Sequence, residues 1–233
     1  MEKKLLHNLA VKIAKSALRI KAIKLSTNPP FEWASRYFMP IYNDNRMFLF
    51  FPGLRLLIIE ALAELINANE IEVDVIAGTS TAGIPWGCLL AEKLGLPFIY
   101  IRGEDKPHGL KNRIEGIDAE SDLGGKKVIV IEDLVSTGGS SAKAVQSVRD
   151  ANGVVTHCIS IFSYGLDKAV NAFDELPEPV IVKSLLEYDT LLEVALSEKY
   201  LTGDQIELLK DWRQDPFEWG KKNAYPRKEE EKK

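Results

Sequence analysis

The strongest constraint on the fold is the stretch of residues 127–141, in which an apolar run meets two acids and then a glycine-rich turn. The run Val-Ile-Val-Ile at 128–131 is typical of a parallel strand that is buried on both faces. Glu132 and Asp133 follow directly, and the pattern after the turn predicts an amphipathic helix over residues 142–152. Open α/β sheets bind ligands at the carboxyl ends of their strands. We therefore expect the primary site here.

Strand and helix patterns alternate along the rest of the chain, which predicts an α/β fold: a mostly parallel sheet flanked by helices. The predicted strands span residues 73–77, 97–101, 128–131, 154–162 and 180–182. The predicted helices span residues 3–24, 52–65, 84–94, 142–152, 167–173, 188–201 and 205–212.

The two ends of the chain differ from this core. Residues 31–51 are rich in aromatic side chains and strand-like, with Pro40 in the middle, which predicts a small antiparallel hood. The sequence from Lys221 onward is dominated by charged residues and is expected to fray. These patterns divide the chain into an N-terminal helix and hood (1–51), a core (52–213) and a charged C-terminal tail (214–233).

The acids and the turn of the central stretch suit a phosphorylated sugar. Carboxylates at a strand end can bind vicinal hydroxyls or a divalent cation, or can simply solvate the strand end. Successive backbone N–H groups over residues 136–141, followed by a helix N-terminus, form an anion-binding nest. The turn is neither a Walker A loop nor a full G-x-G-x-x-G. An ordinary βα turn with a serine cap is the alternative for the turn alone.

Two further segments carry candidate binding groups. The glycine-rich turn at residues 78–83 also lies between a predicted strand and a predicted helix, so it could hold a second anionic group or merely cap that helix. The segment 102–125 is polar and lacks a clear period, and it contains Arg102, Lys106, His108, Lys111 and Arg113. Such a segment is either a solvated basic loop or a mobile lid that closes over a polyanion.

Composition narrows the class of protein. The net charge of −4 and the pI near 5.6 argue against a nucleic-acid binder, since no basic excess is available to neutralise phosphates. Cys88 and Cys158 lie in apolar surroundings and are expected to be buried free thiols in a reducing compartment. No apolar run approaches the ~18 residues needed to span a bilayer. Charges at Lys12 and Lys15 interrupt any signal-peptide core, so a cytoplasmic protein is expected.

Residues 128–141 resemble the ribosyl-pyrophosphate motif of the type I phosphoribosyltransferases, and the wider pattern is similar to the orotate phosphoribosyltransferases. The similarity covers about residues 25–213. The segments that carry it are residues 33–35, 40–42, 44–46, 76–79, 81–85, 108–109, 112, 114–116 and 188.

The resemblance implies a reaction and a set of roles. The protein would transfer ribose 5-phosphate from 5-phosphoribosyl 1-pyrophosphate to orotate in pyrimidine biosynthesis, with Mg²⁺ carried mainly by the substrate and no direct protein ligands. It would act as a homodimer with shared active sites, because the flexible loop of one subunit reaches its neighbour. The implied catalytic residues are Lys106, His108 and Asp133. The implied substrate-binding residues are Arg102, Glu132, Asp133, Leu134, Val135, Ser136, Thr137, Gly138, Gly139, Ser140, Thr79, Ser80, Thr81, Ala82, Tyr42 and Arg46.

The sequence departs from the family pattern where the base is expected to bind. Phe38 and Gly103 stand where many relatives have lysine, and Arg36 is a candidate for the missing cation. Tyr164 and Gly165 stand where some relatives have an arginine. Two alternatives therefore stay open: a phosphoribosyltransferase for a purine or another base, and a non-catalytic regulator that senses ribosyl pyrophosphate.

Overall fold

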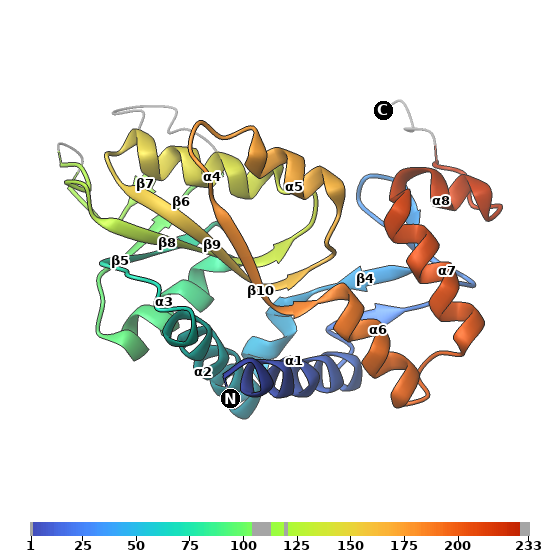
Figure 1. The fold of residues 1–233 in the computed structure, drawn as a ribbon. Coiled ribbons are helices and arrows are strands. Elements are labelled where there is room, and N and C mark those ends of the chain that lie inside the picture. The colour runs from blue at the N-terminus through green and yellow to red at the C-terminus, as the bar shows by residue number, and fades with distance from the viewer. Residues whose placement is uncertain (1, 104–112, 119–120, 229–233) are drawn as a thin grey trace.

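The computed structural model describes residues 2–103, 113–118 and 121–228, and its centre is a six-stranded sheet of order β10-β9-β8-β5-β6-β7 (Figure 1). All neighbouring strands pair parallel except β6 and β7. The predicted mostly parallel sheet is therefore confirmed. The strands are β5 (Val75–Thr79), β6 (Phe98–Ile101), β7 (Ile114–Glu115), β8 (Lys127–Val135), β9 (Val154–Ser163) and β10 (Ile181–Glu187).

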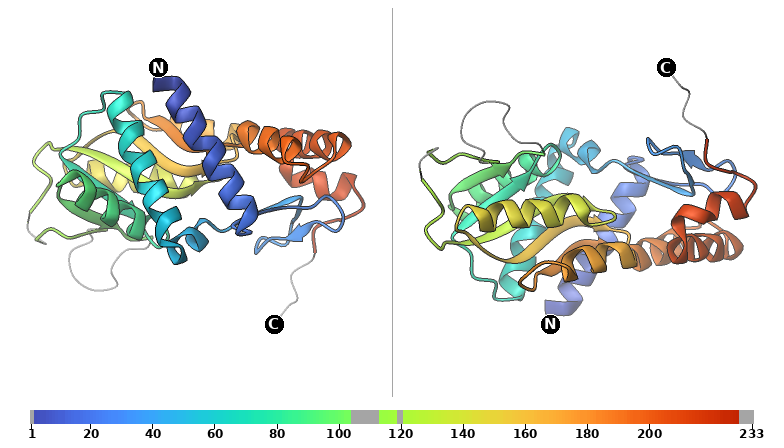
Figure 2. Two further views of the ribbon diagram at one scale, coloured as in Figure 1. Left: turned by 90° about the horizontal axis from the view of Figure 1, so that it is seen from below. Right: turned by 90° about the horizontal axis from the view of Figure 1, so that it is seen from above.

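Helices cover both faces of this sheet, α4 and α5 on one side and α1, α2 and α3 on the other (Figures 1 and 2). The alternating side chains of β8 explain why both faces must be covered. Ile129 and Ile131 pack into one apolar cluster, and Val128 and Val130 pack into a second on the opposite face. The helices are α1 (Glu2–Arg19), α2 (Pro52–Ala68), α3 (Gly83–Leu94), α4 (Gly139–Asp150), α5 (Asp167–Asp174), α6 (Tyr188–Ser197), α7 (Gly203–Gln214) and α8 (Pro216–Lys222).

A small antiparallel unit lies beside the core, as the aromatic segment predicted. Strand β1 (Ile23–Leu25) pairs with β4 (Ile41–Asn43), and β2 (Phe31–Glu32) pairs with β3 (Phe38–Met39). A 3-10 helix, η1 (Asn45–Phe50), leads from β4 toward α2. We call β1–β4 with η1 the hood. Its inner side is held by α7, whose Trp212 donates its indole N–H to the Met39 sulfur at 3.0 Å.

Three local predictions were wrong. The N-terminal helix ends at Arg19 rather than near residue 24, because residues 23–25 pair with β4 instead of continuing the helix. Helix α4 begins at Gly139, three residues before the predicted start, since the glycine-rich turn already forms its first turn. Cys88 is exposed on the outer side of α3, whereas Cys158 is buried as expected.

The C-terminal segment also differs from its prediction. Residues 216–222 form α8, and the chain continues to Lys228 with hydrogen bonds to the hood instead of fraying at Lys221. The division of the chain at residues 51 and 213 stays a prediction. None of the described helices is both long and apolar enough to cross a lipid bilayer.

Candidate active site

A cavity of about 470 Å³ lies at the carboxyl ends of β5, β6 and β8. The parallel register of β5 with β8 brings the turn after β5 next to the acids of β8, as expected for strand ends that share one edge of a sheet. The lining residues are Thr79, Ser80, Thr81, Ala82, Ile101, Arg102, Gly103, Arg113, Glu132, Asp133, Leu134, Ser140, Lys143 and Ala144. The structure thus joins three segments that are far apart in the sequence.

Glu132 is the most buried acid of this cavity, with 7% of its surface exposed. Its two carboxylate oxygens accept hydrogen bonds from the Thr79 hydroxyl at 2.6 Å and from the Ser141 hydroxyl at 2.7 Å. Burial raises the pKa of Glu132 to about 7, although the two hydroxyl donors oppose the shift. Glu132 therefore ties the β5 turn to the start of α4, a positioning contact that the sequence did not reveal.

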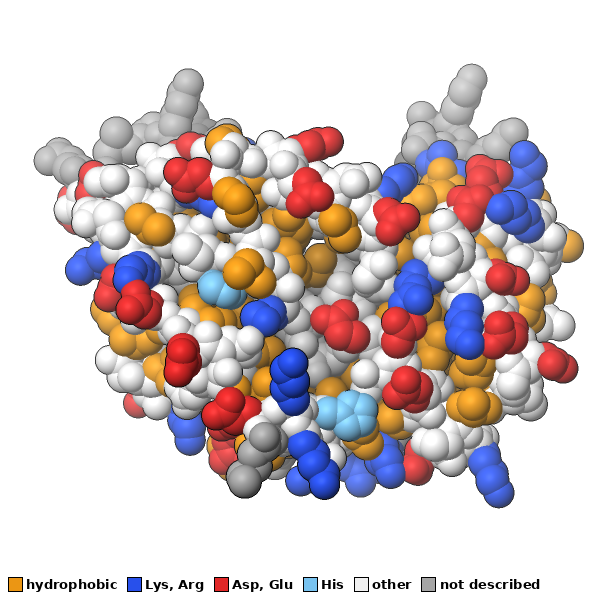
Figure 3. Space-filling view, viewed as in Figure 1, with side chains coloured by type: hydrophobic (Ala, Val, Ile, Leu, Met, Phe, Trp, Pro, Cys, Tyr) orange, Lys and Arg blue, Asp and Glu red, His pale blue; other side chains and the backbone are white. Residues whose placement is uncertain are grey.

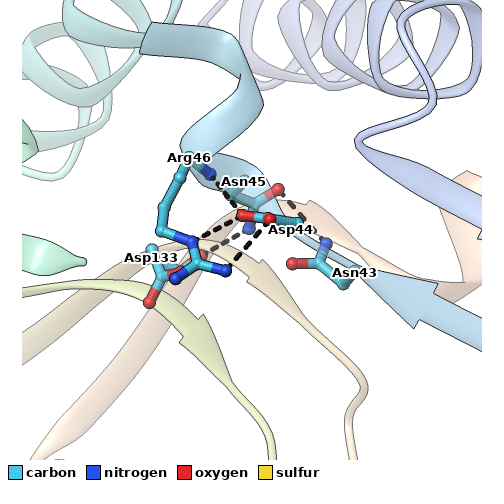
Figure 4. A network of polar contacts seen from close by, with 5 residues as sticks. All are labelled: Asn43, Asp44, Asn45, Arg46 and Asp133. Atoms are coloured by element: carbon cyan, nitrogen blue, oxygen red, sulfur yellow. Dashed lines mark hydrogen bonds and ion pairs between the residues drawn. The ribbon is translucent and has the colours of Figure 1, made fainter. Parts of the chain in front are cut away.

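Asp133, the neighbouring acid, lies beside the hood. Its backbone carbonyl accepts a hydrogen bond of 2.7 Å from the Asn45 amide, and the guanidinium of Arg46 points toward its side chain (Figure 4). Arg46 is itself held by Asp44 through contacts of 2.7 and 3.0 Å to the two carboxylate oxygens. Burial raises the pKa of Asp133 above its ordinary value, and the positive charge of Arg46 opposes that shift. The two adjacent acids thus contact different parts of the protein: Glu132 contacts the β5 turn and α4, and Asp133 contacts the hood.

The turn between β8 and α4 has the geometry of an anion cradle. Gly138 adopts a left-handed conformation with φ of 77°, and a Cβ on it would lie 2.9 Å from the Ala169 backbone. Glycine is therefore required both by the backbone conformation and by the close approach of α5. The turn delivers the N-terminus of α4 to the cavity edge, where Ser140 lines the cavity. Such a helix start binds anions through its unpaired N–H groups.

Cations surround the mouth of the cavity. Arg102 lies 3.5 Å from Glu115 of β7, and its backbone N–H donates to the Arg113 carbonyl. Lys143 lies on the same face of α4 as Ser140, and within the described part of the chain it makes no ion pair. The cavity is thus lined by three cations, Arg102, Arg113 and Lys143, and by two acids. This combination suits a polyanionic ligand that also carries hydroxyl groups.

The predicted site residues fall into four groups. Nine line the cavity: Thr79, Ser80, Thr81, Ala82, Arg102, Glu132, Asp133, Leu134 and Ser140. Ser136, Thr137, Gly138 and Gly139 form the adjoining turn and helix start, while Val135 lines a separate apolar cavity of about 260 Å³. Tyr42 and Arg46 belong to the hood, where Arg46 reaches Asp133 and the ammonium of Lys24 lies over the Tyr42 ring. Lys106 and His108 lie outside the described residues.

Sequence reasoning missed Lys143, and it expected Ser141 only as a hydroxyl donor of the phosphate-binding turn. Lys143 follows Ser140 by three residues, and this helical spacing is a signal that it shares the cavity-facing side of α4. The sequence did not predict that the Ser141 hydroxyl binds Glu132, because this contact depends on how the turn folds back. Arg36, the candidate for the missing hood cation, pairs instead with Glu32 at 3.2 Å within the hairpin. Tyr164 is fully buried among aromatic rings, including Trp33 and Trp212.

Comparisons with known proteins agree with this geometry. The family model of the phosphoribosyl transferase domain matches residues 52–177. Orotate phosphoribosyltransferase from Listeria monocytogenes serotype 4b is 46% identical over 209 residues, which cover 90% of this chain and 97% of that protein. The enzyme of the same name from Cytophaga hutchinsonii is 40% identical over 214 residues, covering 92% of this chain and all of that protein.

Solved structures show the same fold. The orotate phosphoribosyltransferase of Aeropyrum pernix superposes with a TM-score of 0.67 at 24% identity, covering 82% of this chain and 99% of that one. Because its cavity combines acids with two strand-end turns and its sequence matches these relatives over nine tenths of its length, the chain belongs to the orotate phosphoribosyltransferase family.

Proposed function

We propose that this protein transfers ribose 5-phosphate from 5-phosphoribosyl 1-pyrophosphate to orotate, releasing pyrophosphate and forming orotidine 5-monophosphate. The observation that carries the proposal is the cavity at the ends of β5, β6 and β8. It places two acids, two glycine-containing turns and three cations around one volume, which suits a sugar that bears phosphates at both ends.

Each part of the cavity would take one part of the substrate. The turn at residues 136–140 and the start of α4 would hold the 5-phosphate. Asp133 would bind the ribose hydroxyls, while Glu132 fixes the two turns around it through Thr79 and Ser141. Thr79, Ser80, Thr81 and Ala82 would face the pyrophosphate together with Arg102. The hood residues Tyr42 and Arg46 would contact orotate.

Catalysis would rest on orientation and charge. As the bond from the ribose carbon to pyrophosphate breaks, the sugar gains oxocarbenium character and the leaving group gains negative charge. Arg102 would stabilise that growing charge, and the cavity would hold the orotate nitrogen in line with the breaking bond. Lys106 and His108 stay predictions of the sequence, with the same proposed role in stabilising the leaving group.

The cavity residues fit a metal ion that arrives with the substrate. Within the described residues there is no group of three His, Cys, Asp or Glu side chains that could hold a metal ion. Both oxygens of Glu132 already accept hydroxyl hydrogen bonds, so Asp133 is the lining carboxylate that would contact the ion. When bound, Mg²⁺ supplies Lewis-acid neutralisation of the pyrophosphate oxygens.

The direct test is an assay with Mg²⁺, 5-phosphoribosyl 1-pyrophosphate and orotate, in which loss of orotate absorbance reports turnover. We expect turnover with orotate and none with adenine, guanine or xanthine. Turnover with a purine but not with orotate would replace the proposed base. Binding of ribosyl pyrophosphate without turnover of any base would favour a regulator instead.

Lys143 supplies a narrower prediction. Lys143→Ala is expected to raise the KM for ribosyl pyrophosphate by about tenfold with kcat nearly unchanged, because a cation at the cavity edge binds the substrate and the transition state alike. Steady-state kinetics at saturating orotate measure this. Lys126→Ala is the matched control, since Lys126 is exposed near the opposite, amino end of β8. An unchanged KM in Lys143→Ala would exclude contact with the substrate.

We also propose that the protein acts as a homodimer. Large exposed apolar side chains on η1 and at the start of α2 support this, since such side chains, when clustered, mark interaction surfaces. Phe50 is 83% exposed and Leu56 is 53% exposed, with Met47 and Phe51 beside them in sequence. The cytoplasmic location stays a prediction.

A further inference from the structure

The C-terminal residues 216–228, which we call the strap, run along the hood hairpin formed by β2 and β3. Lys228 pairs with Glu32 of β2 at 2.6 Å, and its backbone N–H donates to the Arg36 carbonyl. Arg227 donates to the Ser35 carbonyl at 3.2 Å, and its guanidinium lies 4.8 Å from the centre of the Tyr37 ring. The strap therefore contacts both strands and the turn of one short hairpin.

Tyr225 is the centre of this contact. Its ring lies 5.8 Å from that of Phe38, and its hydroxyl donates to the Asn28 side chain at 2.8 Å. At Gly220 a Cβ would lie only 3.1 Å from the Phe38 carbonyl and 2.5 Å from the Tyr225 carbonyl. The chain therefore needs a glycine there in order to fold back onto β3.

The other side of the strap reaches the core. The Phe217 ring lies 5.2 Å from Tyr37 of the hairpin, and the Lys168 ammonium of α5 lies 3.9 Å from the Phe217 ring centre. The surface is hollowed between the part that carries α4 and α5 and the part that carries α8 (Figure 3). The contact of Phe217 with Lys168 joins α8 to α5, so the strap links the hairpin to the core as well as covering it.

The hairpin in turn positions the hood residues that face Asp133. The Trp33 indole donates to the Ile41 carbonyl of β4 at 2.8 Å, and the segment after β4 carries Asn45, which binds the Asp133 carbonyl. A two-stranded hairpin with two paired residues per strand is too small to be rigid alone. Its position must come from contacts outside it, and because the hairpin binds β4 through Trp33, those contacts add to the pairing of β4 with β1.

We propose that the strap is a positioning element for the base: it fixes the hairpin and supports β4, and thereby holds the hood residues Tyr42 and Arg46 in place, with Arg46 facing Asp133. This inference rests on the proposed function. The cavity that would take the ribosyl pyrophosphate contains no residue of the strap or hairpin. The strap therefore acts on the affinity for orotate and leaves the affinity for ribosyl pyrophosphate unchanged, because preorganised groups bind without an ordering cost.

The test compares Tyr225→Ala with Tyr225→Phe and with a chain that ends at Asp215. Tyr225→Ala and the truncation are expected to raise the KM for orotate by about tenfold, with the KM for ribosyl pyrophosphate within about twofold of the original. Tyr225→Phe keeps the ring contact with Phe38, so its KM for orotate is expected to stay close to that of the unmodified protein. Tyr200→Ala, which removes a tyrosine that is 43% exposed beyond α6, is the matched control.

If the truncated chain fails to fold, hydrogen exchange in the full-length variant still tests the proposal. Hydrogen exchange in Tyr225→Ala should be faster at residues 31–43 and unchanged in β5 and β8. Equal increases in both KM values, no increase in either, or unchanged exchange at residues 31–43 would overturn the positioning role. If the unmodified protein does not turn over orotate, the proposed function fails, and the exchange of residues 41–43 alone then decides whether the strap positions β4.

Discussion

Arg102→Ala is expected to lower kcat with orotate and ribosyl pyrophosphate by roughly 10²–10³-fold, the loss typical when one group that stabilises developing charge is removed. Arg102 follows β6 directly, lines the cavity and lies beside the turn that would face the pyrophosphate, since the Ser80 backbone N–H donates to the Ile101 carbonyl. Negative charge on pyrophosphate grows as its bond to the ribose breaks. The guanidinium therefore interacts more strongly with the transition state than with the bound substrate, so kcat should fall more than KM rises.

Steady-state kinetics with both substrates varied measure this effect. Arg102→Lys keeps the charge and should recover part of kcat, whereas Arg19→Ala, at an exposed arginine at the end of α1, should behave as the unmodified protein. A normal thermal midpoint is required of each variant, because Arg102 also pairs with Glu115. If Arg102→Ala raised KM and left kcat intact, Arg102 would bind the ground state only.

Glu132→Gln is expected to remove a pH dependence of stability that the unmodified protein shows between about pH 4.5 and pH 7. Burial raises the pKa of Glu132 in the folded state to about 7, from an ordinary value of 4.5. The folded state thus binds more protons than the unfolded state in this window, so the stabilisation is complete below pH 4.5 and is lost as the pH rises through 7. From pH 5 to pH 8 the unmodified protein should lose roughly 2–3 kcal/mol of stability relative to Glu132→Gln.

Denaturant unfolding measures the free energy of unfolding of both proteins at each pH. The contributions of the other titrating groups largely cancel in the difference, because both proteins contain those groups. The glutamine oxygen can still accept from one of the two hydroxyls, Thr79 or Ser141, that bind the carboxylate. Glu193→Gln changes an exposed acid on α6 and should give a curve parallel to that of the unmodified protein. Parallel curves for Glu132→Gln as well would mean that Glu132 is not protonated in the folded protein near pH 7.

Local patterns predicted the core of the fold well. The apolar run at residues 128–131 became the centre of β8, and Pro52 begins α2 as proposed, because both signals act over a few neighbouring residues. Predictions failed where distant partners compete with local preference. Residues 23–25 leave the helical pattern because β4 offers hydrogen bonds, and residues 223–228 are ordered because the hairpin offers aromatic and charged partners.

The same distinction between local signals and distant partners holds for the residues of the candidate site. Sequence motifs singled out Asp133, Ser140, the turn at residues 79–82 and Arg102, all of which line the cavity, because each lies at or shortly after the carboxyl end of a strand. They did not predict that Glu132 is held by Thr79 and Ser141, or that Lys143 shares the cavity. These contacts join residues that are 53 and 9 positions apart, or depend on which side of α4 faces the cavity.

By itself, the sequence determined the α/β class and predicted both the edge of the sheet where the cavity lies and the chemistry of the proposed ligand. Those properties follow from the order of residues along single strands and turns. Only the tertiary structure decided which of the two adjacent acids is buried, and that the strap closes over the hood. The reason is that burial and charge pairing depend on neighbours that are distant in the chain, and only strand register and helix packing bring these neighbours together.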